Sequence, residues 1–242
     1  MIRNIALIAG RELRSYLRTP MGYIIAALLL AVDGLLFNAF AMGTSERFSA
    51  DVIKDFFYFS AGTTMVLAIL LSMRLFAEER QLGTLVLLRT APVSDGEAVA
   101  GKYLAALGYV TLVTLLTLPM PLLIMVNGKV AVGHLVAGYL GLFLLSSASV
   151  AIGTLGSALA NNQVVAAITS TALLMVLLLS WMLARVTEPP VAEIFSQLSL
   201  FDKHFTPFMR GMIHTQDLVY YASITYFFLL AATLVLKSRR WR

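Results

Sequence analysis

Long apolar segments alternate with short polar segments along most of the chain. Six apolar segments are long enough to cross a bilayer, for which a helix needs roughly 20 residues. They lie near residues 21–42, 56–76, 103–125, 134–159, 164–184 and 218–236. Because a spanning helix satisfies its own backbone hydrogen bonds, this pattern predicts an all-α fold with six transmembrane helices. We expect residues 1–242 to form one transmembrane domain.

Residues 1–19 have a different pattern, which predicts an amphipathic helix rather than a span. One face of this helix is apolar and the other carries four arginines. Basic amphipathic helices lie in the membrane surface, so we expect this helix at the interface. The apolar face consists of Ile2, Ile5, Ala6, Ala9, Leu13, Tyr16 and Leu17, and the basic face of Arg3, Arg11, Arg14 and Arg18.

Composition supports a membrane protein, because 59% of the residues are hydrophobic, 13% are charged and the mean hydropathy is +0.84. Absence of cysteine excludes disulfides and thiolate chemistry. Twelve of the 18 Lys and Arg lie in residues 1–19, in residues 74–102 and at the C-terminus. By the positive-inside rule, these three segments are cytoplasmic. The net charge of +5 therefore reflects topology and contact with anionic lipid, rather than binding to nucleic acid.

Residues 74–102 form the longest charged stretch between apolar segments. A helix carrying an acidic and basic cluster is followed by a glycine and a leucine-rich turn, and a proline then ends this first part. Ser94 and Glu97 have the spacing of a capping box, which predicts a second helix. This two-part protrusion presents charges and leucines to another protein, whereas the simpler interpretation is an ordinary solvated loop helix. The residues concerned are Glu78, Glu79, Arg80, Gly83, Thr84, Leu85, Leu88 and Pro92.

This stretch resembles the coupling element of permeases of the ABC-2 family, with the pattern EER-x-x-GT-x-x-x-L-x-T-x-P-V-S. A second stretch lies in residues 185–217, which we expect to form short interfacial or re-entrant helices on the outer side. It resembles a loop of the gliding-motility type of these permeases, with the pattern H-F-x-x-F-x-R-G. The outer-loop residues are Phe201, His204, Phe205, Phe208, Arg210 and Gly211.

The resemblance implies a permease subunit in the bacterial cytoplasmic (inner) membrane. It implies two copies of a separate ATP-binding cassette subunit, a second permease chain that is identical or homologous, and in some relatives an auxiliary subunit with an extracytoplasmic domain. ATP and Mg²⁺ would belong to the ATP-binding subunit, because this chain has no GxxxxGK[ST] loop. We expect no enzymatic activity, cofactor or metal in the chain itself, since its three histidines are widely scattered.

Asp33 departs from the family pattern, which usually has a small or apolar residue there. An acid near the middle of a span is costly unless it is protonated, paired or facing water. It is either a functional acid, facing a pore or another subunit, or a protonated group hydrogen-bonded inside the bundle. Two other functions stay open. One is a secondary transporter driven by an ion gradient through Asp33, and the other is a membrane anchor that transmits mechanical work through residues 185–217.

Overall fold

The computed structural model describes residues 2–42, 48–84, 92–127 and 130–239. Secondary structure within these ranges is entirely helical. Six helical stretches in this part of the chain are long and apolar enough to cross a membrane. The prediction of an all-α protein with six spans is confirmed at this level.

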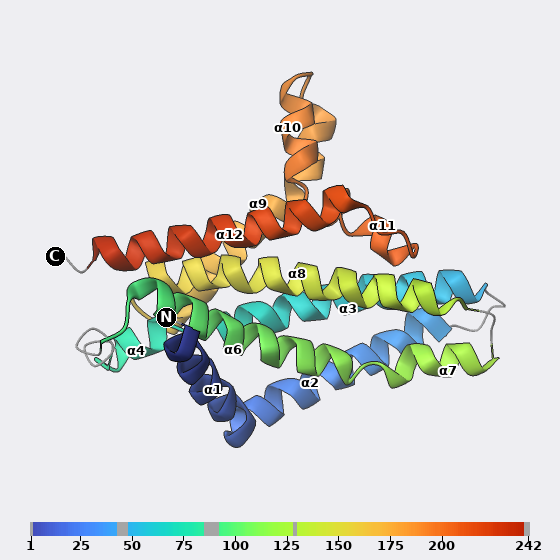
Figure 1. Cartoon of the computed structure of the whole chain (residues 1–242). Helices are drawn as coiled ribbons and strands as arrows, with labels where there is room; N and C mark the ends of the chain where they lie inside the picture. Colours follow the sequence, from blue (N-terminus) through green and yellow to red (C-terminus); the bar gives the residue numbers. More distant parts are fainter. Residues whose placement is uncertain (1, 43–47, 85–91, 128–129, 240–242) are drawn as a thin grey trace.

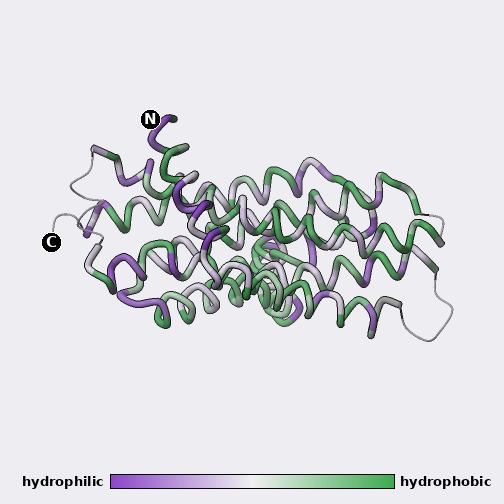
Figure 2. The backbone as a smooth tube through the Cα atoms, turned by 90° about the horizontal axis from the view of Figure 1, so that it is seen from below, coloured by the Kyte–Doolittle hydropathy of each residue, from purple (hydrophilic) through white to green (hydrophobic). Residues whose placement is uncertain are grey.

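The spans form an elongated bundle with both termini at one end (Figure 1). Figure 2 shows hydrophilic residues most strongly in α1 (Ile2–Arg18) and near that same end. The short helix α4 (Ala77–Gln81) lies there, and α7 (Pro119–Asn127) lies at the opposite end. The spans are α2 (Pro20–Leu36) with its π-helical extension η1 (Phe37–Met42), α3 (Ser49–Ser72), α6 (Asp95–Leu115) with α7 (Pro119–Asn127), α8 (Val132–Leu159), α9 (Gln163–Val186) and α12 (Thr215–Ser238).

Helix α8 is at the centre of the bundle and packs against α3, α6, α9 and α12. Small residues make these close contacts possible, as expected for helices that associate inside a membrane. A Cβ atom at Gly153 would lie 1.8 Å from Ser72 Oγ, and one at Gly138 would lie 2.1 Å from the Phe57 ring. These two glycines of α8 therefore serve packing within the subunit.

Two boundaries differ from the pattern-based expectation. Helix α3 begins at Ser49, although residues 43–55 were expected to be a loop. Asp51 lies in the first turn of α3, where its negative charge stabilises the positive end of the helix dipole. Ile53 is fully buried, so this turn packs into the core. The third span begins earlier as well, at Asp95, and is interrupted between α6 and α7 just before Pro119. The sequence accounts for this interruption, because proline lacks the amide donor that continues a helix.

Helix α1 (Ile2–Arg18) lies obliquely to the bundle and packs against α6 (Figure 1). Of the residues on the predicted apolar face, Ile2 is 83% exposed and Tyr16 is buried. Ile8 instead approaches α6 closely, with its Cβ 2.8 Å from the position a Cβ would take at Gly101. Tyr16 is buried against Tyr109, with ring centroids 5.5 Å apart. The side of α1 that is buried is thus the side that fits against α6. The periodicity of α1 alone contains no information about that fit.

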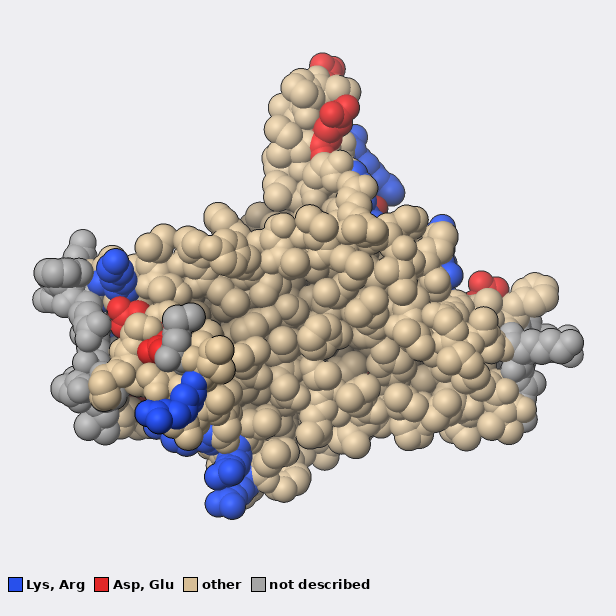
Figure 3. Space-filling model, in the orientation of Figure 1, with Lys and Arg blue, Asp and Glu red and all other residues tan. Residues whose placement is uncertain are grey.

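Residues 185–217 contain two short helices, α10 (Val191–Leu198) and α11 (Thr206–Met209). Helix α10 projects from the side of the bundle (Figure 1). Figure 3 shows charged side chains at the end that carries α1, on this projection and at the opposite tip, with a broad uncharged face between them. A wide uncharged face of this kind is suited to contact with lipid or with another apolar surface.

Candidate coupling site

The polypeptide leaves α3 through a turn at residues 73–76 before it enters α4. Ser157 of α8 holds this turn from the side. Its Oγ accepts hydrogen bonds from the amides of Phe76 (3.0 Å) and Ala77 (3.1 Å) and donates one to the Met73 carbonyl (3.1 Å). These amides open α4 and lack partners within that helix. The turn is therefore fixed to α8, an arrangement that nothing in the local sequence predicts.

The three charged residues of the EER cluster all have partners inside the chain. Glu78 forms a two-pronged ion pair with Arg74, at 2.7 and 2.9 Å. Glu79 accepts from Lys102 Nζ at 2.8 Å. Arg80 donates to two carbonyls at the end of α8, those of Ala158 (3.1 Å) and Ala160. In this structure the cluster joins α4 to its neighbours, and contact with a partner protein stays a proposal.

Lys102 of α6 is the centre of this network, although only 1% of its surface is exposed. Its Nζ lies 2.8 Å from Glu79 of α4, 3.4 Å from Glu12 of α1 and 5.4 Å from the centroid of the Phe76 ring. Arg11 adds a contact to Glu12 at 2.9 Å and one to Glu79 at 4.0 Å. Burying a charge is costly unless it is paired, so the buried Lys102 ammonium requires these carboxylates. It thereby connects α1, α4 and α6.

The sequence analysis counted Lys102 only among the cytoplasmic basic residues and did not predict that it is buried in a network. The one feature of the sequence that could have indicated burial is the long apolar segment that directly follows this lysine. Glu12 and Arg11 were likewise assigned to the surface helix alone. The Ser94 and Glu97 capping box is confirmed, with Glu97 Oε2 accepting from the Ser94 amide at 2.9 Å and Ser94 Oγ accepting from the Glu97 amide at 3.3 Å.

Other residues of the stretch are placed at the surface. Gly83 has a positive φ of 74°, which favours glycine, and Thr84 Oγ1 donates to the Glu79 carbonyl at 3.3 Å. Leu82, a candidate apolar anchor together with Leu85 and Leu88, is 68% exposed. Pro92 is exposed as well. Leu85 and Leu88 lie outside the described residues.

The pKa of the Glu12 carboxyl reflects opposing effects. Burial raises it, but the Lys102 ammonium and the Arg11 guanidinium outweigh burial and hold the pKa below its ordinary value of 4.5. A carboxyl with a lowered folded-state pKa contributes stability above its unfolded pKa, and this contribution is lost as pH falls through the folded pKa.

We therefore expect Glu12→Gln to unfold at a lower temperature than the wild type at neutral pH. The difference should shrink below about pH 4.5, where the unfolded carboxyl becomes protonated. Thermal unfolding of both proteins in detergent over a series of pH values measures it. Because every other carboxyl is common to both proteins, their titration cancels in the difference. A gap that stays constant to about pH 3 would contradict the assignment.

Asp33 lies in α2 and is 6% exposed. Its Oδ1 accepts a hydrogen bond from Thr63 Oγ1 of α3 at 2.8 Å. The structure therefore gives this acid a polar contact inside the subunit, as in the simpler of the two interpretations. A role in moving ions or cargo has no support from this contact.

The H-F-x-x-F-x-R-G residues of the outer loop mostly serve packing. Phe205 and Phe208 are fully buried, and Arg210 is exposed. His204 Nδ1 lies 2.7 Å from Asp217 Oδ1, its Nε2 lies 3.2 Å from the Gln197 carbonyl, and its ring stacks on Tyr220 at 3.7 Å. Phe201 is half-buried against Phe205, and Gly211 has a φ of 79° beside His134.

Among the described residues, no group of three or more His, Cys, Asp or Glu is placed to hold a metal ion. A sequence profile described as ABC-2 type transporter matches residues 3–201 of the 242 residues. The chain belongs to the ABC-2 type transporter family. No match was found among curated proteins.

An ABC-2 membrane domain is the permease component of an ABC transporter. Such a component is normally not itself an ATPase and generally works with a separate ATP-binding subunit. Family membership and the six apolar helices together identify this chain as a multi-pass membrane protein. The residues of the network around Lys102 and Arg80 all lie within residues 3–201, the part of the chain that matches the ABC-2 family.

Proposed function

We propose that this permease couples ATP hydrolysis on a separate ATP-binding cassette subunit to export, or to mechanical work, across the membrane. Residues 74–102 would be the coupling element, and both termini would be cytoplasmic. The observation that carries the proposal is the buried Lys102, which ties α4 to α1 and α6. Arg80 adds a connection from α4 to the end of α8. A force applied to α4 would therefore reach α1, α6 and α8.

The exposed surface around α4 is where the ATP-binding subunit would dock. Leu82 would supply an apolar anchor next to Gly83 and Thr84, and the exposed Pro92 is a further candidate for this contact. Leu85 and Leu88 are further candidates for the same contact. Because the charges of the EER cluster are already paired within the chain, we assign them to transmission rather than to docking. Closure of the partner would then tilt α4 and move α3 through the turn held by Ser157.

The wider assembly follows from the resemblance to gliding-motility-type permeases. We propose two ATP-binding subunits carrying ATP and Mg²⁺, a second permease chain that is identical or homologous, and an auxiliary subunit with an extracytoplasmic domain. The location would be the bacterial cytoplasmic (inner) membrane. Exposed Arg3, Arg14 and Arg18 on α1 would contact anionic lipid headgroups at the cytoplasmic surface, and α10 and α11 would lie at the outer interface.

The test uses movement of the spans as the readout, because it does not require a known cargo. The chain has no cysteine, so two introduced cysteines at the exposed Val176 and Tyr226 can carry spin labels. We expect ATP to change the distance between the labels in the complex with the ATP-binding subunit. Glu79→Ala, which removes the acceptor of Lys102, and Gly83→Pro, which is incompatible with a positive φ, should each abolish the change while ATP hydrolysis continues.

Glu188→Ala is the matched control, because this exposed glutamate lies at the far end of α9. It should retain the ATP-dependent change in distance. If Glu79→Ala and Gly83→Pro both respond to ATP like the control, the coupling role is refuted. Export and mechanical work use the same coupling element, so this experiment supports both equally. Identification of an auxiliary subunit that co-purifies with the complex would favour mechanical work.

A further inference from the structure

Helix α1 is attached to α6 along most of its length. Every fourth residue of α1 from Asn4 to Tyr16 contacts α6, and residues four apart lie on one face of a helix. The contacts include a hydrogen bond at 3.5 Å, a close apolar fit, an ion pair at 3.4 Å and a pair of rings 5.5 Å apart. They join Asn4 to Glu97, Ile8 to Gly101, Glu12 to Lys102 and Tyr16 to Tyr109. We therefore treat α1 and α6 as one unit, which contains the Lys102 ammonium.

The chain turns sharply from α1 into α2, and residues 16–22 form this elbow (Figure 1). A Cβ atom at Gly22 would lie 2.0 Å from the Tyr16 carbonyl oxygen, so only glycine fits where the two helices meet. The Tyr109 hydroxyl of α6 donates to the Gly22 carbonyl at 2.7 Å. Tyr109 is 3% exposed, which shelters this hydrogen bond from water. Its ring thus contacts α1 while its hydroxyl holds α2.

Beyond the elbow, α2 is the least enclosed of the six spans. Only 17% of its apolar window is buried, against 67% for the spans that contain α3 and α8. An apolar groove of about 570 Å³ lies between α2, α3 and α9. The contacts of α2 with α3 include the hydrogen bond from Thr63 to Asp33 at 2.8 Å and the packing of Phe37 on Phe56. Helix α2 is therefore fixed to α6 at the elbow and has space beside it in its outer part.

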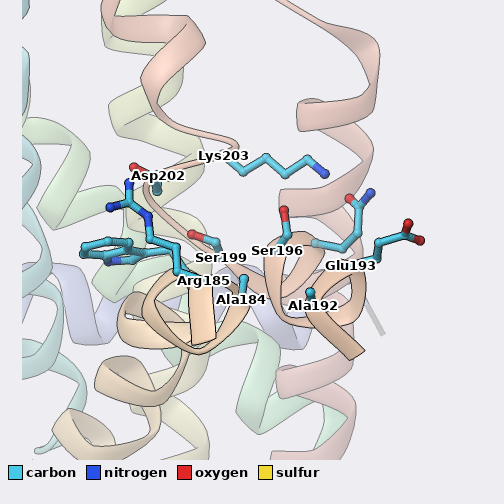
Figure 4. A pocket seen from close by; sticks show the side chains of 10 residues that line it. Ala184, Arg185, Ala192, Glu193, Ser196, Ser199, Asp202 and Lys203 are labelled. Carbon is cyan, nitrogen blue, oxygen red and sulfur yellow. The ribbon is translucent and has the colours of Figure 1, made fainter. Parts of the chain in front are cut away.

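The α9 wall of this groove is tied to a different part of the chain. Trp181 lines the groove, and the Arg185 guanidinium lies over its ring, 4.6 Å from the centroid. Figure 4 shows Arg185 beside Asp202, which belongs to the segment after α10. The Leu200 amide of the same segment donates to the Leu177 carbonyl at 3.2 Å. These contacts do not involve α1, α2 or α6, so α2 can shift relative to α9 without breaking them.

We propose that α2 follows the α1 and α6 unit through the elbow and moves relative to the other spans, with Tyr109 as the positioning residue of this joint. This role rests on the proposed function, because the coupling network would supply the movement. Glu12 and Tyr16 lie one turn apart on the same face of α1, so a displacement of the Lys102 network reaches the elbow within a single turn.

The elbow gives α4 a second route to the spans. One route leads to α3 through the turn held by Ser157, and the other leads to α2 through Lys102 and the elbow. The two routes meet at the groove between α2 and α3. The hydrogen bond between Asp33 and Thr63 is the polar contact that a relative shift of these two spans would change.

The test compares two pairs of spin labels in the complex with the ATP-binding subunit. Leu35 of α2 is 70% exposed, and a cysteine there pairs with one at Tyr226 of α12, which packs on the central α8. A second pair, at Val176 and Tyr226, reports on α9. We expect ATP to change the distance between the Leu35 and Tyr226 labels in the wild type.

Tyr109→Phe keeps the ring beside Tyr16 but removes the hydroxyl that holds Gly22. It should leave the distance without ATP unchanged. With ATP, the ratio of shifted to unshifted α2 should fall by about fivefold, the effect of losing one buried hydrogen bond. The response of the Val176 and Tyr226 pair and the rate of ATP hydrolysis should be retained. Tyr103→Phe is the matched control, because it removes a hydroxyl of the same helix that contacts Ser147 of α8 at 2.7 Å. It should behave as the wild type.

Equal responses of α2 in Tyr109→Phe and Tyr103→Phe would overturn the role of the elbow. If Tyr109→Phe changes the α2 distance equally with and without ATP, the hydroxyl only supports the fold, and its role in transmission is overturned. If ATP changes only the Val176 and Tyr226 distance in the wild type, α2 does not follow the unit and this inference fails, while the proposed function stands. If ATP changes neither distance in the wild type, the proposed function and this inference fail together.

Discussion

Lys102→Met is expected to destabilise the protein by about 3 kcal/mol and to release α1 and α4 from α6. The substitution keeps a long apolar side chain but leaves Glu12 and Glu79 without their shared cation. Glu79 Oε2 already has no hydrogen-bond partner among the described residues, so loss of the ammonium leaves this carboxylate poorly compensated. The two glutamate side chains are 18% and 21% exposed, and partial hydration keeps the effect at the lower end of the range for buried pairs.

Thermal unfolding in detergent measures this effect, with Lys237→Met as the charge-matched control. Lys237 is exposed at the end of α12, so its removal should change stability by less than about 0.5 kcal/mol. A triple variant, Glu12→Gln, Glu79→Gln and Lys102→Met, provides an internal check. Because it removes the charges together, it should recover much of the loss seen in Lys102→Met. Equal unfolding temperatures for Lys102→Met and Lys237→Met would show that the network does not stabilise the fold.

Gly138→Ala is expected to have a comparable effect through packing, with a loss of about 3 kcal/mol. The added Cβ would lie 2.1 Å from two atoms of the Phe57 ring and 2.6 Å from a third. The ring is fully buried and packs edge-on against Phe56 and Tyr139, so it has little room to move. Helices α3 and α8 would have to separate, which disturbs contacts along their length. The measurement is again the unfolding temperature, together with the yield of folded protein from membranes.

Gly108→Ala is the control for this substitution. It places the same methyl group in a spanning helix, but nothing lies within 4 Å of the new Cβ. We expect it to be neutral or slightly stabilising, because alanine favours a helix over glycine by up to about 1 kcal/mol. Adding Phe57→Leu to Gly138→Ala should restore part of the lost stability by replacing the ring that clashes. If the double variant is no better than Gly138→Ala, a different contact limits packing at this position.

Signals that act over a few residues were readable from the sequence. The six spans follow from apolar length, because a helix needs about 20 such residues to cross the hydrocarbon. The Ser94 and Glu97 capping box involves two groups three residues apart, and the interruption before Pro119 follows from one missing amide. Even here the start of α3 was misplaced. The polar residues before Phe56 suggested a loop, yet the fully buried Ile53 lies on a helical turn that tertiary packing draws into the core.

The sequence by itself also determined that residues 74–102 are special, since charge is concentrated there between apolar segments. Only the tertiary structure decided what those charges contact. Lys102 and Glu12 are separated by 90 positions, Arg80 and Ala158 by 78, and Ser157 and Phe76 by 81. Which side chains meet over such distances depends on the rotation and tilt of each helix. Those are set by the close approach of surfaces such as Gly101 to Ile8 and Gly153 to Ser72. A periodic pattern describes one helix at a time, so it contains no information about these pairings.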